Sequence, residues 1–469
     1  MLKDIDLNSI FPKRKGIFSE DEVFDVAIVG AGVVGCGIFK EFCFNGAKTI
    51  LVEKSNDILE GASKGNSAIL HTGFDAPPDS LELECIKRGY EEFIKLKSDM
   101  DLQLLNTKAM VVAWSDEQLQ KLDAILQKGL GNGVKRLELL EASQVLSREP
   151  NLSSHAKGAI LVHGESVIDA WSAPLAYVKS GVANGGKLAL SHEVKSGKFN
   201  GEYWELQTSQ KSIKAKLVIN AAGLWGDIVE QISKNVDFKI IPRKGQFLIF
   251  DKSANSLVES IILPVPTKRT KGVVITKTAF GNLLVGPTAE DQESRENSDT
   301  FKQTLEDLKD KAYAMLPSLK GHGVTATFAG LRPASDEPQY RVKINDAKNW
   351  ITVGGIRSTG LTASLGLAKY VFELSELEAK QSELGYEKVP NITEFKKRMH
   401  QLGNFKEIIC HCELVTDKEI KDALSGEVSA GTIGGLKRRT RAMMGRCQGF
   451  NCMARVSEII EKEVQNGRD

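Results

Sequence analysis

The sequence has no long apolar run and no excess of charge of either sign. No stretch approaches the ~20 consecutive apolar residues that a membrane-spanning helix needs, and the mean hydropathy is −0.20. Lys and Arg total 62 and Asp and Glu total 61, which gives a formal net charge of +1. We therefore expect no membrane span and no nucleic-acid partner, because nucleic-acid binding proteins usually carry a positive excess.

The N-terminus lacks the apolar central stretch of a secretory signal, since its first 23 residues mix acids and bases. We expect residues 1–23 to form an extension and the protein to be cytoplasmic, with any contact to a membrane made through a partner. The chain has 469 residues, about three times the ~150 residues typical of one domain. Two or three domains are expected.

Cysteine is sparse through most of the chain. Three of the seven cysteines, Cys36, Cys43 and Cys85, are scattered through N-terminal sequence with a helical pattern. The other four are all in the last 60 residues: Cys410, Cys412, Cys447 and Cys452. A long chain without a signal peptide argues against a disulfide framework. The late quartet therefore predicts a metal centre.

A glycine-rich turn near the N-terminus has the context of a nucleotide site. Gly30, Gly32 and Gly35 follow a short apolar run and open a helical pattern, and Glu53 ends the next apolar run 23 residues after Gly30. Such glycines allow the backbone and a helix N-terminus to approach a pyrophosphate. Glu53 would accept hydrogen bonds from the ribose hydroxyls, which excludes NADP but leaves FAD and NAD open.

Two later segments indicate that this nucleotide fold is interrupted. Residues 217–223 form an apolar run that ends in small residues, and residues 350–355 form another that ends in paired glycines. Small residues at a strand end let a bulky ligand or another backbone approach. The fold would then be completed about three hundred residues after it begins, a span that a simple NAD domain does not need.

Together these segments resemble the FAD-dependent D-amino-acid oxidase superfamily, in its branch of glycerol-3-phosphate dehydrogenases and L-2-hydroxyglutarate oxidases. The segments that carry the match are the glycine turn with Glu53 and residues 63–73, 218–223, 328–333 and 354–364. The resemblance implies an α/β fold class, with a Rossmann-like FAD-binding domain interleaved with an α+β substrate domain. A small helical iron–sulfur domain would follow at the C-terminus.

The resemblance also implies domain boundaries. The oxidoreductase would span residues 24–385, with FAD-binding parts at about 24–103, 160–235 and 326–385 and a substrate domain at about 104–159 and 236–325. A linker would occupy residues 386–404, and the iron–sulfur domain residues 405–469. The polar stretch between residues 373 and 400 is expected to form a charged helix and linker.

The resemblance assigns cofactor contacts along the chain. Gly30, Gly32, Gly35 and Glu53 would hold the adenosine diphosphate end of FAD. Ser63, Asn66 and Ser67 would contact its middle, and Gly223 would leave room for it at a strand end. The flavin edge would contact Gly355, Gly360, Leu361 and Thr362.

Two residues are candidates for the chemistry. Arg332, in the segment Gly-Leu-Arg-Pro, matches the position that grips the carboxylate or phosphate of the substrate, and guanidinium binds such anions bidentately. The alternative is a surface pair with Asp336. His71 is the candidate base because its unperturbed pKa of ~6.5 is near working pH; the alternative is a packing role. Arg357 is a weaker second candidate for anion contact.

The late cysteines follow the pattern C-x-C, 34 intervening residues and C-x4-C. This spacing suits either a [2Fe–2S] cluster or structural zinc. The surrounding sequence resembles the bacterioferritin-associated-ferredoxin-like domain of several flavin dehydrogenases, which implies that Cys410, Cys412, Cys447 and Cys452 hold a [2Fe–2S] cluster. Six basic and no acidic residues lie between residues 431 and 455; they could balance the charge of a cluster, bind a phosphate or dock an acidic partner.

The leading interpretation is an FAD-dependent dehydrogenase for a small anionic secondary alcohol. sn-Glycerol 3-phosphate, oxidised to dihydroxyacetone phosphate, is the substrate that the resemblance favours, with electrons passing through the cluster to a quinone or a partner protein. L-2-Hydroxyglutarate and an amino acid or opine remain alternatives on the same fold. A non-catalytic flavin and iron–sulfur electron-transfer subunit is the alternative from another class.

Overall fold

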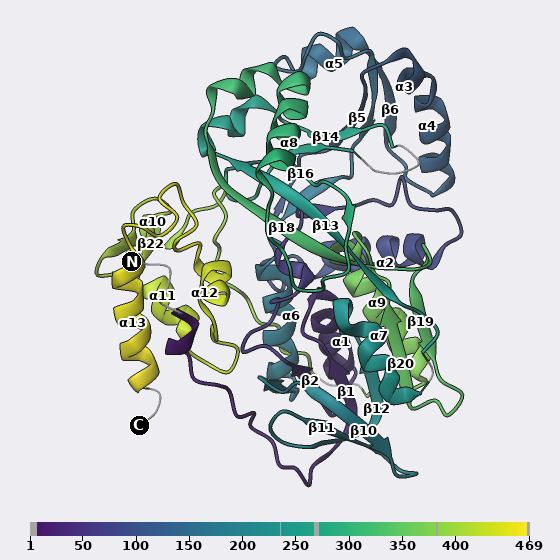
Figure 1. Ribbon diagram of the computed structural model, residues 1–469, viewed down its shortest axis with the longest axis vertical. Coiled ribbons are helices and arrows are strands. Elements are labelled where there is room, and N and C mark those ends of the chain that lie inside the picture. The colour runs from purple at the N-terminus through teal and green to yellow at the C-terminus, as the bar shows by residue number, and fades with distance from the viewer. Residues whose placement is uncertain (1–6, 235, 267–271, 381–382, 467–469) are drawn as a thin grey trace.

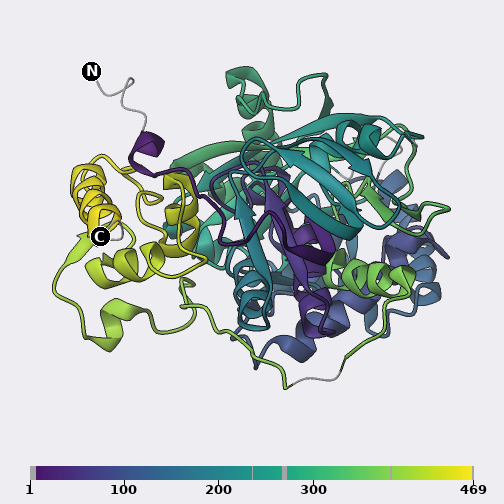
Figure 2. The same ribbon diagram turned by 90° about the horizontal axis from the view of Figure 1, so that it is seen from below.

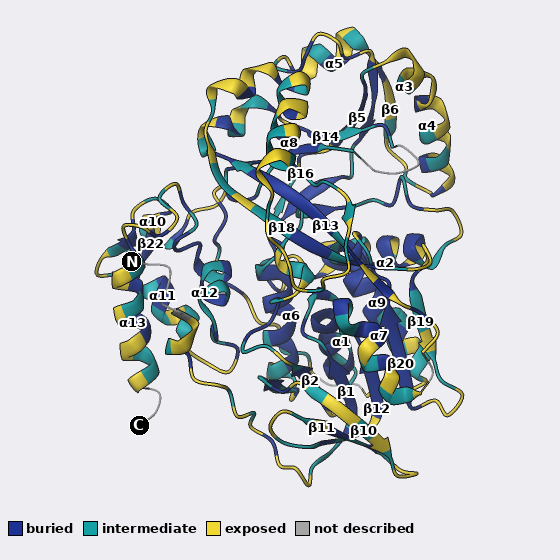
Figure 3. Cartoon of the chain, viewed as in Figure 1, coloured by how far each residue is buried: buried dark blue, intermediate teal, exposed yellow. Residues whose placement is uncertain are grey.

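The computed structural model describes residues 7–234, 236–266, 272–380 and 383–466. Two large sheets lie one beyond the other along the longest axis of the molecule, and a small helical domain lies beside them (Figure 1). Strands in the interior of both layers are buried, whereas the outer helices expose one face to solvent (Figure 3).

The first sheet has eight strands and a parallel centre, in the order β9-β2-β1-β12-β20. Its parallel strands are β1 (Val23–Val29), β2 (Thr49–Glu53), β9 (Lys187–Leu190), β12 (Ile213–Asn220) and β20 (Trp350–Gly354). Three antiparallel strands extend it: β10 (Val194–Phe199), β11 (Trp204–Thr208) and β19 (Arg341–Ile344). Strand β20 pairs with β12, so the predicted late completion of the nucleotide fold is found.

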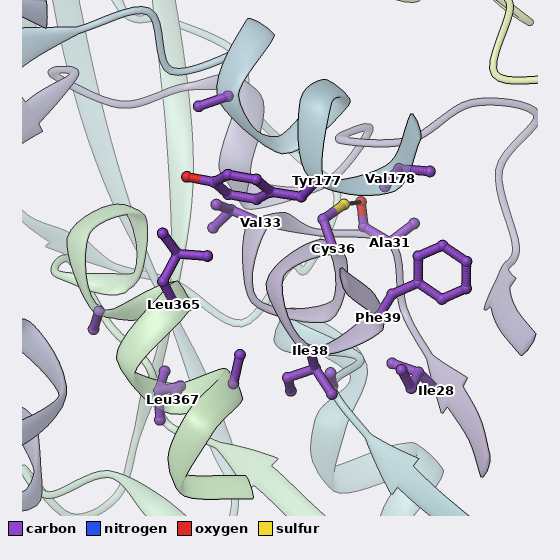
Figure 4. Packing of buried hydrophobic residues seen from close by; sticks show 14 of the residues in the cluster. Ile28, Ala31, Val33, Cys36, Ile38, Phe39, Tyr177, Val178, Leu365 and Leu367 are labelled. Carbon is purple, nitrogen blue, oxygen red and sulfur yellow. Dashed lines mark hydrogen bonds between the residues drawn. The ribbon is translucent and has the colours of Figure 1, made fainter. Parts of the chain in front are cut away.

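Helix α1 (Val33–Phe44) packs on β1 and β2 of this sheet; α6 (Ser172–Ala183) and α9 (Gly360–Ser375) pack on α1, and α2 (Leu81–Leu96) packs on α9. Helix α1 lies between α6 and α9, and its apolar side chains interlock with Tyr177 and Leu365 (Figure 4). The thiol of Cys36 donates to the carbonyl of Ala31 within this core, and burial raises its pKa. Burial also raises the pKa of Cys43 and Cys85 to about 12. The three early cysteines are therefore core residues.

The second sheet has nine strands, in the order β17-β13-β16-β15-β14-β5-β7-β6 with β18 paired to β13. They are β5 (Ala109–Ala113), β6 (Leu137–Glu141), β7 (Gly158–Val162), β13 (Ile240–Phe250), β14 (Ile261–Pro264), β15 (Val274–Lys277), β16 (Leu283–Gly286), β17 (Glu290–Asp291) and β18 (Val324–Ser335). Its helices are α3 (Asp116–Gln120), α4 (Leu122–Gly131), α5 (Ala142–Arg148) and α8 (Lys302–Met315). Residues 326–335, which we assigned to an FAD-binding part, thus lie in the second sheet, and the domain boundaries remain a prediction.

A short third sheet joins the two layers. It contains β3 (Ile69–Leu70), β8 (Ser166–Ile168) and β4 (Leu104–Leu105), with β8 in the middle. Helix α7 (Gly226–Glu230) follows β12, and short 3-10 helices η2 (Ala62–Lys64), η3 (Gly223–Trp225), η4 (Gln231–Ser233), η5 (Lys252–Leu257) and η6 (Pro317–Gly321) lie in the connections.

The C-terminal domain contains β21 (Ile408–Cys410), β22 (Val415–Thr416), α11 (Asp417–Leu424), α12 (Ile433–Thr440) and α13 (Met453–Asn466), with α10 (Met399–Leu402) before them. The N-terminal segment runs alongside this domain (Figure 2). It contains η1 (Leu7–Ile10), and Phe11 packs into the same core as Leu436 and Val456. The predicted extension therefore contributes to the fold of the C-terminal domain.

The polar stretch before this domain differs from our expectation. Helix α9 ends at Ser375, and no helix is found among the described residues from there to Met399. Tyr386 instead packs edge-on against Phe44, and the Asn184 side chain bonds the backbone at Gly385. The predicted charged helix is wrong, because this segment takes its partners from the main body. No helix in the part of the chain that the structure describes is long and apolar enough to cross a membrane.

Candidate active site and cluster-ligand site

A cavity of about 720 Å³ opens where the two large sheets meet. Its wall is formed by the carboxyl ends of β1, β2 and β12, by the N-termini of α1 and α9, and by residues of β13 and β18. Twelve of the residues predicted to act on cofactor or substrate line it: Gly30, Gly32, Glu53, Ser63, Asn66, Ser67, His71, Gly223, Arg332, Gly355, Gly360 and Leu361. The sequence segments that were far apart are thus brought to one place.

The glycine turn is as tight as its sequence predicts. Gly30 has φ +109°, and a Cβ there would lie 2.5 Å from the carbonyl oxygen of Ala221. Gly35 does not line the cavity; a Cβ there would lie 1.8 Å from the carbonyl oxygen of Gly30. Gly35 therefore lets α1 approach the turn, while Gly30 and Gly32 form its open surface.

Glu53 stands at the end of β2 beside this turn. Its carboxylate accepts hydrogen bonds from the backbone N–H of Ala31 (2.8 Å) and of Ser55 (2.9 Å). Burial raises the pKa of Glu53. The side chain is thus held where the fingerprint requires an acceptor for ribose hydroxyls.

The predicted middle contacts also organise the loop itself. The hydroxyl of Ser63 accepts from the backbone N–H of Val33 (2.9 Å), at the start of α1. The side chain of Asn66 donates to the carbonyl of Ser63 (2.7 Å) and accepts from the N–H of Ala68 (2.7 Å). These residues fix the wall of the cavity between α1 and β3.

Thr362 has a different position from the one we predicted. It is buried in α9 and does not line the cavity. Its hydroxyl accepts from the backbone N–H of His71 (2.9 Å) and donates to the carbonyl of Ile69 (3.3 Å). Thr362 therefore fixes the backbone that carries His71.

His71 pairs with a buried carboxylate that our sequence reasoning missed. Leu70 on β3 lies opposite Ser166 on β8, so His71 comes next to Glu165. Nδ1 of His71 lies 2.9 Å from Oε2 of Glu165, whose side chain is fully buried. The other carboxylate oxygen accepts from the N–H and the hydroxyl of Thr72, at 2.6 and 2.8 Å. A carboxylate so placed keeps a proton on Nδ1 and leaves Nε2 as the basic atom.

Glu165 could not be found from sequence spacing. It lies 94 residues from His71, and only the pairing of two short strands joins them. The one local signal is that Glu165 is an acidic residue directly before an apolar strand. This pattern is common in proteins and does not single out Glu165.

Arg332 enters the cavity from β18. Its guanidinium donates to the carbonyl of Thr288 (2.5 Å), and a Cβ at Gly245 would lie 2.2 Å from its Nη2. The glycine therefore makes room for the guanidinium. Burial and the neighbouring charge of Arg243 lower the pKa of Arg332 to about 10.

Arg332 forms no ion pair with a carboxylate in the described part of the chain, although Asp291 is near enough to attract its charge. Arg243, opposite it on β13, forms a two-bond ion pair with Asp291 (2.6 and 3.1 Å). Asp336, the surface partner that we weighed, bonds the backbone of Lys239 instead. Within the described residues, no carboxylate lies at ion-pair distance from Arg332. An anion in the cavity would supply the missing partner.

Two other cations near the cavity are committed to protein groups. Arg357 lines the cavity, and its guanidinium lies 3.3 Å from Glu82. Lys244 is buried, and its ammonium donates to the side chain of Asn297 (3.3 Å) and the carbonyl of Asp299 (3.1 Å). Arg332 is therefore the better candidate for anion binding.

The four late cysteines come together in two pairs. The thiols of Cys410 and Cys452 are hydrogen-bonded to each other, and so are those of Cys412 and Cys447. No group of three or more Cys, His, Asp or Glu side chains in the described chain converges as one metal site. Two such pairs could supply two thiolates to each iron of a [2Fe–2S] cluster.

In each pair the environment lowers the pKa of one thiol, Cys410 or Cys447, and raises the pKa of its partner, Cys452 or Cys412. The hydrogen bond from Cys452, with backbone N–H groups of Met443 and Glu413, lowers the pKa of Cys410 to about 6. Backbone N–H groups, that of Asn451 first, lower the pKa of Cys447. Such donors stabilise the thiolates that iron requires.

Comparison with known proteins decides the family. A family model described as FAD dependent oxidoreductase matches residues 25–374, and one described as BFD-like [2Fe-2S] binding domain matches residues 408–462. This chain belongs to the FAD-dependent oxidoreductase family. A glycerol 3-phosphate dehydrogenase of Caloramator mitchellensis is 34% identical over 454 residues, which cover 94% of this chain and 95% of that protein.

Two further relatives of this oxidoreductase bear on its fold and substrate. An FAD-bound L-α-glycerophosphate oxidase structure from Mycoplasma pneumoniae aligns with a TM-score of 0.75 at 26% identity, over 79% of this chain and all of that one. An L-2-hydroxyglutarate dehydrogenase of Indibacter alkaliphilus is 29% identical over 272 residues, covering 57% of this chain and 68% of that protein.

The oxidoreductase therefore uses FAD and a [2Fe–2S] cluster, as we predicted. The cavity fits FAD in size and lining, since ligand pockets typically measure ~300–1,000 Å³ and two helix N-termini open onto it. Gly30, Gly32 and Glu53 would hold the nucleotide end, and Gly355, Gly360 and Leu361 the flavin edge.

Proposed function

We propose that this flavoenzyme oxidises sn-glycerol 3-phosphate to dihydroxyacetone phosphate and passes the electrons through its cluster to a protein or quinone acceptor. The observation that carries the proposal is the presence, in one FAD cavity, of the His71–Glu165 pair and of Arg332, which forms no ion pair with a carboxylate of the described residues. A base and a fixed positive charge are what oxidation of an anionic alcohol requires.

His71 acts as the base in this proposal. Bound FAD would supply the acceptor for hydride from the carbinol carbon, and the proton of the hydroxyl must leave as the ketone forms. Glu165 holds the proton of Nδ1, so Nε2 of His71 receives the hydroxyl proton. The imidazolium that results is stabilised by the adjacent carboxylate.

Arg332 positions the substrate. Its guanidinium binds the phosphate, and the carbonyl of Thr288 fixes one end of the planar group. Binding of a dianion raises the pKa of Arg332 again, because it offsets the burial and the repulsion from Arg243 that lower it. Arg332 is therefore charged throughout the working pH range.

The cluster receives electrons singly, which suits transfer from a two-electron flavin to a one-electron acceptor. We place the enzyme in the cytoplasm, since its seven cysteines are all free thiols and thiols are kept reduced there. Contact with a membrane would then be made through the acceptor.

L-2-Hydroxyglutarate is the second candidate substrate, since Arg332 can bind a carboxylate as well as a phosphate. It is also the substrate in the name of the Indibacter relative. An amino acid or opine is a third possibility on the same fold, and a non-catalytic relay subunit would need neither His71 nor Arg332.

An anaerobic screen tests the proposal. The purified holoenzyme is mixed with sn-glycerol 3-phosphate, L-2-hydroxyglutarate or amino acids, and the flavin absorbance is followed. We expect rapid bleaching with sn-glycerol 3-phosphate and slow or no bleaching with the others. Bleaching by L-2-hydroxyglutarate alone would reassign the substrate, and no bleaching by any of them would favour the relay subunit.

A further inference from the structure

The loop after β2, residues 54–63, has two faces with different neighbours. On its inner face Lys54, Glu60 and Ser63 line the FAD cavity. On its outer face the loop contacts α12 of the iron–sulfur domain, about 370 residues later in the chain. We call this segment the FAD loop.

Asp57 is the centre of this contact. Its side chain is fully buried, and its two oxygens accept from Arg439 of α12 at 2.7 and 2.9 Å. It also accepts from the backbone N–H of Gly431 (2.9 Å). Only glycine fits at position 435 of α12, because a Cβ on Gly435 would lie 1.7 Å from Oδ2 of Asp57.

A second ion pair lies beside the first. Arg438 donates to Glu60 (2.6 Å) and to the carbonyl of Ile58 (3.1 Å), and the hydroxyl of Thr432 donates to Glu60 (2.7 Å). The side chain of Arg438 is 8% exposed. Glu60 lines the cavity, so its anchoring to α12 fixes part of the cofactor wall.

These contacts bear on the six basic residues between residues 431 and 455, for which the sequence left three roles open. Five of the six, namely Arg438, Arg439, Arg441, Arg446 and Arg455, form ion pairs with carboxylates of this chain. In two of those pairs the carboxylate, Glu60 or Asp57, belongs to the FAD loop. A buried pair is costly to break from one side, because the partner left behind keeps an uncompensated charge.

We propose that the iron–sulfur domain clamps the FAD loop, with Arg439 and Arg438 as positioning residues for the FAD site. Docking of α12 holds residues 57–60 in the conformation that binds FAD. By linkage, bound FAD must favour docking of α12 to the same extent. The proposal concerns FAD and not the substrate, so it stands or fails independently of the glycerol 3-phosphate assignment.

The first test is the FAD affinity of Arg439→Gln, a change made in the iron–sulfur domain and outside the cavity. Deflavinated protein is titrated with FAD, with iron content measured in parallel. We expect the Kd for FAD to rise on the order of tenfold, within the usual range of coupling between sites. The control is Asp251→Asn, which breaks the pair between Asp251 and Arg446 (2.9 Å), another contact between the domains that does not touch the FAD loop. Its FAD affinity should stay at the wild-type value.

An Arg439→Gln protein that retains iron and binds FAD as tightly as the wild type would overturn the proposal. If that variant loses iron, the proposal is tested instead by amide hydrogen exchange of the wild-type protein. FAD binding should slow amide exchange in α12 relative to the deflavinated protein. Equal exchange in α12 with and without FAD would also overturn the clamp.

Discussion

The two cofactor sites of this enzyme are built in opposite ways. The FAD cavity is lined by residues from Val29 to Leu361, among them glycines and the N-termini of α1 and α9. The proposed cluster site would take four cysteine side chains from the C-terminal domain alone, and Cys410 and Cys452 belong to the core of that domain. We therefore expect that loss of one FAD contact weakens FAD binding only in part, whereas loss of one of the four cysteines abolishes the cluster.

Replacement of a cluster ligand should have the largest effect. Cys410→Ser removes one thiolate from the site and one member of the small core, so we expect loss of iron and unfolding of the C-terminal domain. FAD should remain bound, though more weakly because the clamp is lost. Metal and acid-labile sulfide analysis measures this, with Cys85→Ala as a buried cysteine control that keeps iron. Full iron content in Cys410→Ser would contradict the ligand assignment.

Replacement of His71, the proposed base, should have the second largest effect. His71→Asn should slow flavin reduction by substrate by roughly 10²–10⁴-fold, the usual contribution of a general base. FAD content and iron content should stay at the wild-type level. Stopped-flow reduction under anaerobic conditions measures the rate, and a wild-type rate across pH would reduce His71 to a packing residue.

Arg332→Ala removes the charge that faces the substrate. The buried ion pair with an anion is typically worth about 2–5 kcal/mol, so KM for the anionic substrate should rise much more than kcat falls. FAD content serves as the control. Unchanged KM for every anionic substrate would rule out this role for Arg332.

Glu165→Gln tests the positioning of His71. Loss of such a supporting partner typically costs about 10–100-fold, less than loss of the base. Because Gln cannot stabilise the imidazolium, the low-pH limb of the pH profile, where His71 becomes protonated and cannot act as a base, should shift to lower pH. Glu165→Asp should recover part of the rate. A pH profile equal to that of the wild type would show that Glu165 is only structural.

The smallest effect should come from replacing Asp417, at the start of α11, by Asn, which changes the local stability of that helix. Burial raises the pKa of Asp417, but hydrogen bonds from Lys421 and from the N–H groups of Lys406 and Glu407 bring it to about 2. Its pKa is ~3.9 when unfolded, so its stabilising contribution is complete above pH ~4 and is lost as pH falls toward ~2. Amide exchange in α11 should be faster in Asp417→Asn than in wild type at pH ~5, and this difference should vanish near pH ~2. A constant difference would contradict the assigned pKa.

The FAD fold was predictable because its signals are local and periodic. The glycine turn, Glu53 and the strands ending near Gly223 and Gly355 each follow from short apolar runs with fixed flanks. Candidate ligands for the cluster could be named for the same reason, since the spacing of the four late cysteines is compact; their assignment stays a prediction.

The unpredicted features all depend on contacts between distant segments. Glu165 meets His71 only through the pairing of β3 with β8, and Asp57 meets Arg439 across almost the whole chain. The charged stretch after α9 was misread as a helix because its composition suits one, whereas its tertiary partners hold it extended. Propensity and spacing carry no information about such contacts.

The most direct test of the central claim is to follow electrons from substrate to cluster in one anaerobic sample. The oxidised holoenzyme is mixed with sn-glycerol 3-phosphate, and flavin absorbance and the electron paramagnetic resonance of the cluster are recorded together. The account predicts that the flavin bleaches and the signal of the reduced [2Fe–2S] cluster then appears. A bleached flavin beside a cluster that stays oxidised, although dithionite can reduce it, would contradict an electron path between the two sites.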